Sequence, residues 1–147
     1  MTADTPYSSI LAFDFGTKRI GAAAGQAVTG TATPLVPVPA RDGIPDWPRL
    51  DALVAEWQPA ALVVGLPLNM DDSESELSHL ARKFGRRLAA RFRLPVFMCD
   101  ERLSSHAARG LLAEVQARRR GKLPALDSTA AVLIAEAWLA APVEVRP

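Results

Sequence analysis

The chain has 147 residues, of which 49% are hydrophobic and 22% charged, and its formal net charge is +1. These values are typical of one globular domain with a substantial core, and the charge balance alone indicates no particular partner. The single cysteine, Cys99, excludes an internal disulfide and fits a reducing compartment. Because no signal-peptide pattern and no apolar run of membrane-spanning length are present, we expect a cytoplasmic protein without a membrane partner.

The hydrophobic pattern predicts strands alternating with helices after a short polar start. We expect residues 1–9 to be disordered and residues 10–147 to form a single domain. In chain order we expect strands at 10–15, 20–24 and 33–40, a helix from about Asp46 to before Pro59, a strand at 60–65, a helix at 76–93, a strand at 95–99, a helix that follows Ser104 or Ser105 and contains Leu111, and a last helix at 129–140.

This order of elements predicts an α/β fold. Three antiparallel strands followed by helix–strand alternation give a mixed sheet with helices on both faces. The strand at 33–40 alternates prolines with apolar residues, which confines it to an edge of the sheet. The run at 60–65 is apolar without alternation, as expected for a strand that is covered on both faces.

Three acidic residues stand at the ends of predicted elements or among apolar residues. Asp14 lies in the middle of the first strand, Glu101 follows the strand at 95–99, and Asp127 precedes the last helix. Ligands collect beyond the carboxyl ends of parallel strands, so these carboxylates can converge there, where they would repel one another without cations between them. A set of oxygen ligands suits Mg²⁺ or Mn²⁺, and two such ions would clamp the attacking and leaving oxygens of a phosphodiester.

Each acid also has an ordinary structural explanation. Asp127 can be a plain helix cap and Glu101 a partner of Arg102, and for these two residues taken singly we favour such roles. Asp14 is different because a carboxylate within an apolar strand, with no obvious cation, is costly. A cation or a water-filled cleft beside Asp14 is therefore expected.

Four segments, in this order, resemble the motifs of the YqgF (RuvX) family. They are Leu11–Gly21, Val63–Asp71, Asp100–Ser105 and Asp127–Ala131, and the resemblance extends from Ile10 to about Leu139. It implies a ribonuclease H-like fold related to Holliday-junction resolvases and a nuclease that depends on divalent metal ions. Bacterial members of the family are assigned to maturing the 5′ end of the small-subunit ribosomal RNA precursor, pre-16S rRNA.

Carried onto this chain, the resemblance makes Asp14, Glu101 and Asp127 the catalytic and metal-binding acids. It implies that Asp14 bridges two metal ions, Mg²⁺ or Mn²⁺, while Glu101 and Asp127 each help to hold one. The segment 122–126, which leads into Asp127, is longer than is usual in the family. This difference bears on the path of the loop more than on the acids themselves.

Basic residues near these acids are candidates for contact with nucleic acid. Gly16 would let the backbone approach the scissile phosphate, and Lys18, Arg19 and Arg102 would contact flanking phosphates, although solvated turn charges are an equal alternative for Lys18 and Arg19. The loop before Asp127 adds Arg118, Arg119, Arg120 and Lys122. A solvated surface is the simpler explanation for the basic residues of the helix at 76–93, namely Arg82, Lys83, Arg86, Arg87, Arg91 and Arg93.

Alternatives remain for both the function and the substrate. The Asp-x-Gly-Thr pattern at 14–17 also occurs in ATP-phosphate-binding proteins of the sugar-kinase and actin type, but this chain is too short for their two lobes. A non-catalytic RNA- or ribosome-binding adaptor is the other class. For a nuclease, the resemblance favours precursor ribosomal RNA, which a monomer could process. Branched DNA is also possible and would require a homodimer, because a junction resolvase needs two active sites.

Overall fold

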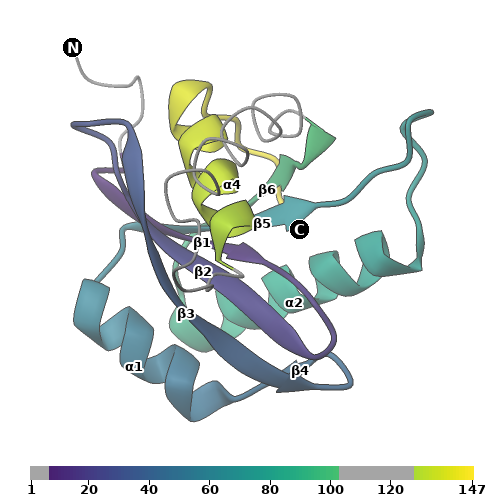
Figure 1. Ribbon diagram of the computed structural model, residues 1–147, viewed down its shortest axis with the longest axis horizontal. Coiled ribbons are helices and arrows are strands. Elements are labelled where there is room, and N and C mark those ends of the chain that lie inside the picture. The colour runs from purple at the N-terminus through teal and green to yellow at the C-terminus, as the bar shows by residue number, and fades with distance from the viewer. Residues whose placement is uncertain (1–6, 103–127) are drawn as a thin grey trace, which may run out of the picture.

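The computed structural model describes residues 7–102 and 128–147, which are built around one mixed β-sheet (Figure 1). Within these ranges six strands follow the order β4-β3-β2-β1-β5-β6. β1 is antiparallel to β2 and parallel to β5, which in turn is parallel to β6. The strands are β1 (Ser9–Asp14), β2 (Arg19–Gln26), β3 (Thr31–Arg41), β4 (Ile44–Pro45), β5 (Ala61–Leu66) and β6 (Val96–Asp100). The predicted mixed sheet is therefore confirmed.

Within the described residues, three helices cover the two faces of this sheet, as the chain order predicts. They are α1 (Trp47–Trp57), α2 (Glu76–Phe92) and α4 (Thr129–Ala140). α1 and α2 lie on one face and α4 lies on the other (Figure 1). The Asp46 carboxylate accepts a hydrogen bond from the N–H of Arg49, so Asp46 caps α1 as expected. Ser75 and Ser78 form a capping box that starts α2.

Alternation along β1 divides the core between the two faces. Leu11 and Phe13 point toward α1 and α2, whereas Ile10 and Ala12 point toward α4. The residue that continues the second series is Asp14, because side chains two residues apart share one face of a strand. The end of β1 therefore directs a carboxyl group toward the α4 face of the sheet.

The two edges of the sheet are protected from pairing with further strands. β3 pairs with β2 along its length but meets β4 only at its last two residues, and it carries Pro34, Pro37 and Pro39, which lack an N–H donor. On the other side, the N–H of Met98 in β6 donates to the carbonyl of Val145 at 2.7 Å. The C-terminal segment thus occupies the outer edge of β6.

Two expectations need adjustment against the described residues. Residues 7–9, which the sequence assigns to a disordered start, are ordered: β1 begins at Ser9 and the Tyr7 ring packs against Phe97, with ring centroids 5.5 Å apart. The helix predicted after Ser104 or Ser105 lies outside the described residues. In the part of the chain that the structure describes, no helix combines the length and apolar character needed to span a bilayer.

Candidate active site

Asp14 occupies the carboxyl end of β1, not its middle as the apolar pattern indicates. Its cross-strand partner in β2 is Gly21. Phe15 continues the apolar run but lies beyond the strand, and its buried ring packs against Phe84 of α2. Burial raises the pKa of the Asp14 carboxyl above its ordinary value. The acid is therefore a half-buried group at the rim of the sheet.

Glu101 follows β6 directly, as the sequence predicts, and its side chain lies over β5. Its backbone N–H donates to the carbonyl of Leu66 at 3.1 Å. A Cβ atom at Gly65 would lie only 2.7 Å from Glu101 Oε2 and 2.6 Å from Ile134 Cδ1 of α4. Only a glycine at position 65 leaves room for both side chains. The Glu101 carboxyl is thus held on the α4 face of the sheet.

The structure brings Asp14 and Glu101 together. Strand register places Phe13 beside Val64 and Leu66 beside Asp100, so β1, β5 and β6 end at a common edge. Burial, followed by the negative charges of Asp14 and Asp100, raises the pKa of Glu101 to about 7. Two like charges in a half-buried place favour protonation unless a cation offsets them. Both side chains offer only oxygen donors, the ligands that Mg²⁺ and Mn²⁺ prefer.

Asp100 and Arg102, the two neighbours of Glu101 in the chain, form an ion pair with each other. The Arg102 guanidinium donates to both carboxylate oxygens of Asp100, at 3.0 Å from Nε and 2.7 Å from Nη2, and this contact lowers the pKa of Asp100. The same guanidinium lies 2.7 Å from Asp72 Oδ1 and donates to the Asn69 carbonyl at 3.1 Å. Arg102 therefore ties the loop after β5 to the end of β6. Its predicted contact with phosphate stays a prediction.

Ser128 is a residue whose role the sequence does not reveal. Its buried hydroxyl donates to the Leu35 carbonyl at 2.5 Å and accepts from the Ala22 N–H at 3.2 Å. Ala22 and Leu35 face each other where the β2–β3 register shifts, so the hydroxyl bridges two backbone groups of the ladder. It makes no side-chain cap bond to α4. The start of α4 is thereby fixed to β2 one residue away from Gly21, the partner of Asp14.

Several predicted site residues lie outside the described ranges. They are Arg118, Arg119, Arg120, Lys122 and Asp127. In residues 7–102 and 128–147, no group of three His, Cys, Asp or Glu side chains is arranged to hold a metal ion. The described part of the chain thus supplies two of the three predicted acids.

The β1–β2 turn contains the remaining candidates. A Cβ at Gly16 would lie 2.5 Å from the Arg19 carbonyl oxygen, so glycine is needed for the turn itself. Lys18 and Arg19 are exposed on this turn. The Lys18 carbonyl accepts from the N–H of Ala40, which joins the turn to the end of β3. The turn is thus an exposed basic segment that follows Asp14 and is hydrogen-bonded to the end of β3.

Comparison with known proteins gives a family and close relatives. The family model described as "RuvX: Holliday junction resolvase" matches residues 8–141. A Pseudomonas aeruginosa protein is 55% identical over 141 residues, covering 95% of this chain and 97% of the relative. An Acinetobacter baylyi protein is 51% identical over 141 residues, covering 96% of both chains. Both relatives carry the name "Putative pre-16S rRNA nuclease".

Solved structures support the fold. The structure of Thermus thermophilus RuvC in complex with a Holliday junction substrate aligns with a TM-score of 0.57 at 19% identity, covering 88% of this chain and 90% of that one. A second Thermus thermophilus RuvC structure aligns with a TM-score of 0.54 at 18% identity, covering 88% of this chain and 92% of that chain. The predicted ribonuclease H-like fold is confirmed by this likeness.

Proposed function

The chain belongs to the RuvX family of Holliday junction resolvases, and from this membership we propose that it is a nuclease that hydrolyses nucleic-acid phosphodiesters with the help of divalent metal ions. Its favoured substrate is the 5′ end of pre-16S ribosomal RNA, in line with the names of its relatives. The observation that carries the proposal is that the Asp14 and Glu101 carboxyls lie close enough to interact electrostatically, at the common edge where three parallel strands end. We propose a cytoplasmic location, in line with a role in processing this RNA.

The two described acids fit a divalent cation by their chemistry. Each is half-buried, each has a raised pKa, and the Asp14 charge contributes to the shift at Glu101. A cation held between them would offset both the burial and the repulsion. We propose that Asp127 is the third metal ligand and that the site binds two ions, Mg²⁺ or Mn²⁺. Support comes from Ser128, the next residue along the chain, whose hydroxyl is bonded to Ala22 beside the partner of Asp14.

The residues of this chain would share the work as follows. When bound, the metal ions would activate a water molecule and offset the charge that develops on the phosphate. Asp14 and Glu101 would hold these ions, and Gly65 leaves space for the Glu101 carboxylate over β5. Lys18 and Arg19 on the β1–β2 turn, and the basic residues at 118–122, would contact substrate phosphates on either side of the scissile bond.

A second candidate function is cleavage of branched DNA, because the family model is described as a Holliday junction resolvase. The same pair of carboxylates would serve both substrates, since both present phosphodiesters to the site. The two functions differ in assembly. Cutting two strands of a junction calls for a homodimer with two sites, whereas trimming an RNA end is possible for a monomer.

A cleavage assay tests the proposal. Precursor 16S ribosomal RNA and a synthetic four-way DNA junction are incubated with the protein in Mg²⁺, in Mn²⁺ and in EDTA. We expect metal-dependent shortening of the RNA by the wild type and none by Asp14→Asn, while nucleic-acid affinity persists in the variant. Equal inactivity of both proteins on both substrates would refute the nuclease and favour the adaptor. Tight binding of Mg²⁺-ATP without cleavage would favour the nucleotide-binding alternative.

A further inference from the structure

Four of the five basic residues of α2 fall into two groups in the structure. Arg82 donates to Glu74 at 2.7 Å, and Arg91 donates to Asp51 at 2.8 Å, so these charges are used within the protein. Lys83 and Arg87 are exposed, and neither forms an ion pair within residues 7–102 and 128–147. Standing four residues apart, they are neighbours on the helix and repel each other. Among the described residues, Lys83 and Arg87 therefore lack the carboxylate partners that Arg82 and Arg91 have.

Lys83 and Arg87 border a hollow at the end of the sheet where β1 ends, on the α2 side and thus on the opposite face from the Asp14 carboxyl. Its volume is about 150 Å³, and its other walls include Phe15, Phe84, Asp42 and Gly43. Phe15 follows Asp14 in the chain, but its ring packs against Phe84 on the α2 side of the sheet, so the hollow and the acid share one end of β1 on opposite faces. The turn at positions 42 and 43 has left-handed backbone angles, with φ of 51° and 81°.

The hollow is held in place by the two turns beside it. The N–H of Gly43 donates to the Thr17 carbonyl at 2.9 Å, which joins the β3–β4 turn to the β1–β2 turn. A Cβ at Gly43 would lie 3.4 Å from Cζ of Phe15, so the turn packs closely on that ring. The hollow, the exposed Lys18 and Asp14 are thus parts of one end of the molecule.

The lining favours a phosphate over a stacked base. The rings of Phe15 and Phe84 are only 7% and 2% exposed, so they form a floor and do not offer open faces for stacking. A volume of 150 Å³ equals that of about five water molecules, which is enough for a hydrated phosphate group. Asp42 is the carboxylate among the named walls, and two cations outnumber it. The site therefore has the charge and size for one phosphodiester of a strand.

We propose that this hollow binds a backbone phosphate of the substrate strand through Lys83 and Arg87, where the strand passes around the end of the sheet from the phosphodiester that is cut. The inference rests on the proposed nuclease function and adds a positioning site to it. Contacts with phosphates fix register and carry no sequence information. The hollow would thus set which bond of the strand reaches Asp14 and Glu101, independent of base sequence.

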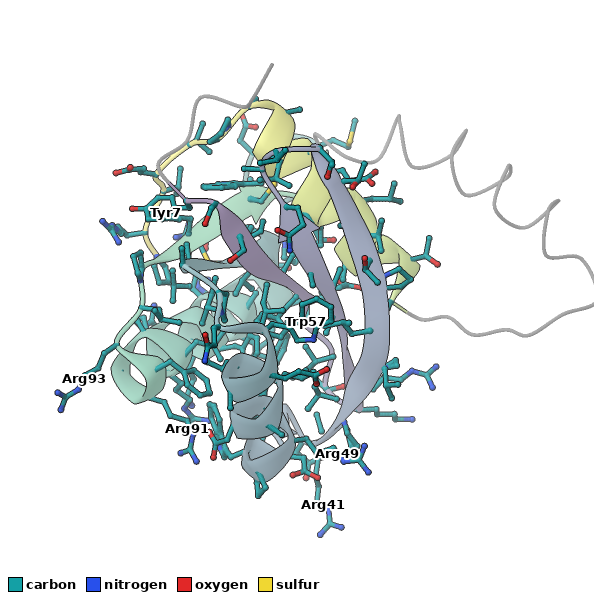
Figure 2. All side chains as sticks on the ribbon, turned by 90° about the vertical axis from the view of Figure 1, so that its left-hand side faces the viewer. Tyr7, Arg41, Arg49, Trp57, Arg91 and Arg93 are labelled. Atoms are coloured by element: carbon teal, nitrogen blue, oxygen red, sulfur yellow. The ribbon has the colours of Figure 1, made fainter. Side chains whose placement is uncertain are left out.

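The test compares two double variants in the non-cleaving Asp14→Asn background. Lys83→Gln/Arg87→Gln removes the two hollow cations. Arg93→Gln/Arg146→Gln is the control, which removes the same charge away from the hollow. Arg93 follows the last residue of α2 and lies well apart from Arg41 at the end of β3, near which the hollow is found (Figure 2). The Arg146 guanidinium lies over the Phe97 ring, on the α4 side of the sheet. Dissociation constants for a labelled RNA hairpin with a single-stranded 5′ extension, and for a four-way DNA junction, are measured between 50 and 200 mM salt. Thermal denaturation verifies that all variants are folded.

We expect the hollow variant to bind at least tenfold more weakly at low salt. For a duplex, the logarithm of the association constant falls with the logarithm of the salt concentration by about 0.9 per phosphate contact. Loss of two contacts should therefore make this slope less steep by about 1.8. The control pair should leave the slope nearly unchanged. The nucleic acid that shows the loss, RNA or junction, identifies the source of the phosphate.

Two results would overturn the inference. One is an equal loss in the hollow and control variants, which would mean that only net charge matters. The other is the absence of binding to either nucleic acid. If the wild type binds with the expected slopes but cleaves nothing, the nuclease proposal fails while the phosphate site stands. If the wild type cleaves and the two double variants behave alike, the phosphate site fails alone.

Discussion

The contact between Gly65 and Glu101 makes a substitution at position 65 a direct test of the site. In Gly65→Ala the new methyl group would lie 2.7 Å from Glu101 Oε2 and 2.6 Å from Ile134 Cδ1. Ordinary contact begins near 3.4 Å, so the carboxylate oxygen must withdraw by about 0.7 Å. Misplacing a catalytic group by about 1 Å can cost about 100-fold in rate. We therefore expect metal-dependent cleavage to fall by about 10- to 100-fold.

The effect on stability is smaller and has a separate cause. Forcing a methyl group into a filled space costs about 1–3 kcal/mol, and the stiffer unfolded chain of an alanine returns about 0.4–1 kcal/mol. Gly65→Ala is thus expected to lose about 1–2 kcal/mol in urea denaturation. The loss of activity must exceed what this stability change explains, because the protein would remain almost entirely folded at 25 °C.

Two further variants separate activity from stability. Gly25→Ala is the matched control, since its Cβ would meet Ile10 at 3.0 Å and Leu139 at 3.1 Å on the same face of the sheet, with no contact to Glu101. It should lose some stability and keep activity within about twofold. In Gly65→Ala/Ile134→Val the aliphatic clash is relieved, so stability should recover in part while activity stays low. Full activity in Gly65→Ala, or recovery of activity by Ile134→Val, would refute the geometry described for Glu101.

Three other predictions follow from the site. Without metal, the raised pKa values of Asp14 and Glu101 mean that the folded state holds protons that the unfolded state releases. The contribution of these two groups to stability is therefore complete below about pH 4.5 and is lost as pH rises through about 7, by at most about 3 kcal/mol for Glu101. Urea denaturation in EDTA should show lower stability at pH 8 than at pH 5, Mg²⁺ should reverse this fall, and Asp14→Asn should reduce both effects. A profile that rises with pH would contradict it. Ser128→Ala should cost about 1–3 kcal/mol because it leaves two buried backbone groups unpaired, and a loss below 0.5 kcal/mol would disprove the bridging role. Arg102→Lys and Arg102→Gln should both speed amide exchange at 69–73, since an ammonium group cannot reproduce the forked contacts, and unchanged protection would show that the loop holds itself.

Local signals explain why much of the fold was predictable. The helix bounds follow from the 3.6-residue pattern and from caps that act within three residues, as Asp46 and Ser75 do. The continuous apolar run of β5 correctly predicted a strand with every residue buried. The end of β1 was misjudged because Phe15 extends the apolar run, although its ring packs against α2 from beyond the strand.

The contacts that build the site are less accessible to sequence reasoning because they join distant segments. Glu101 was predicted as a site residue, but nothing local indicates that its partner in space is the glycine 36 positions earlier. Ser128 resembles an ordinary helix cap, and its hydroxyl is instead used between two strands about a hundred residues away. Arg102 beside an acid is compatible with a phosphate ligand or an ion pair, and only the position of Asp72 and Asn69 shows that the protein itself engages it.

The proline-rich β3 has a consequence for the behaviour of the protein in a crowded cell. An open strand edge is a template for another chain, and repeated edge pairing leads to aggregation. Pro34, Pro37 and Pro39 remove donors from that edge, while Val145 occupies the backbone at the opposite edge of the sheet. Accidental polymerisation is thereby opposed at both ends of the sheet by different means, and removal of either protection should be seen first as turbidity of concentrated solutions.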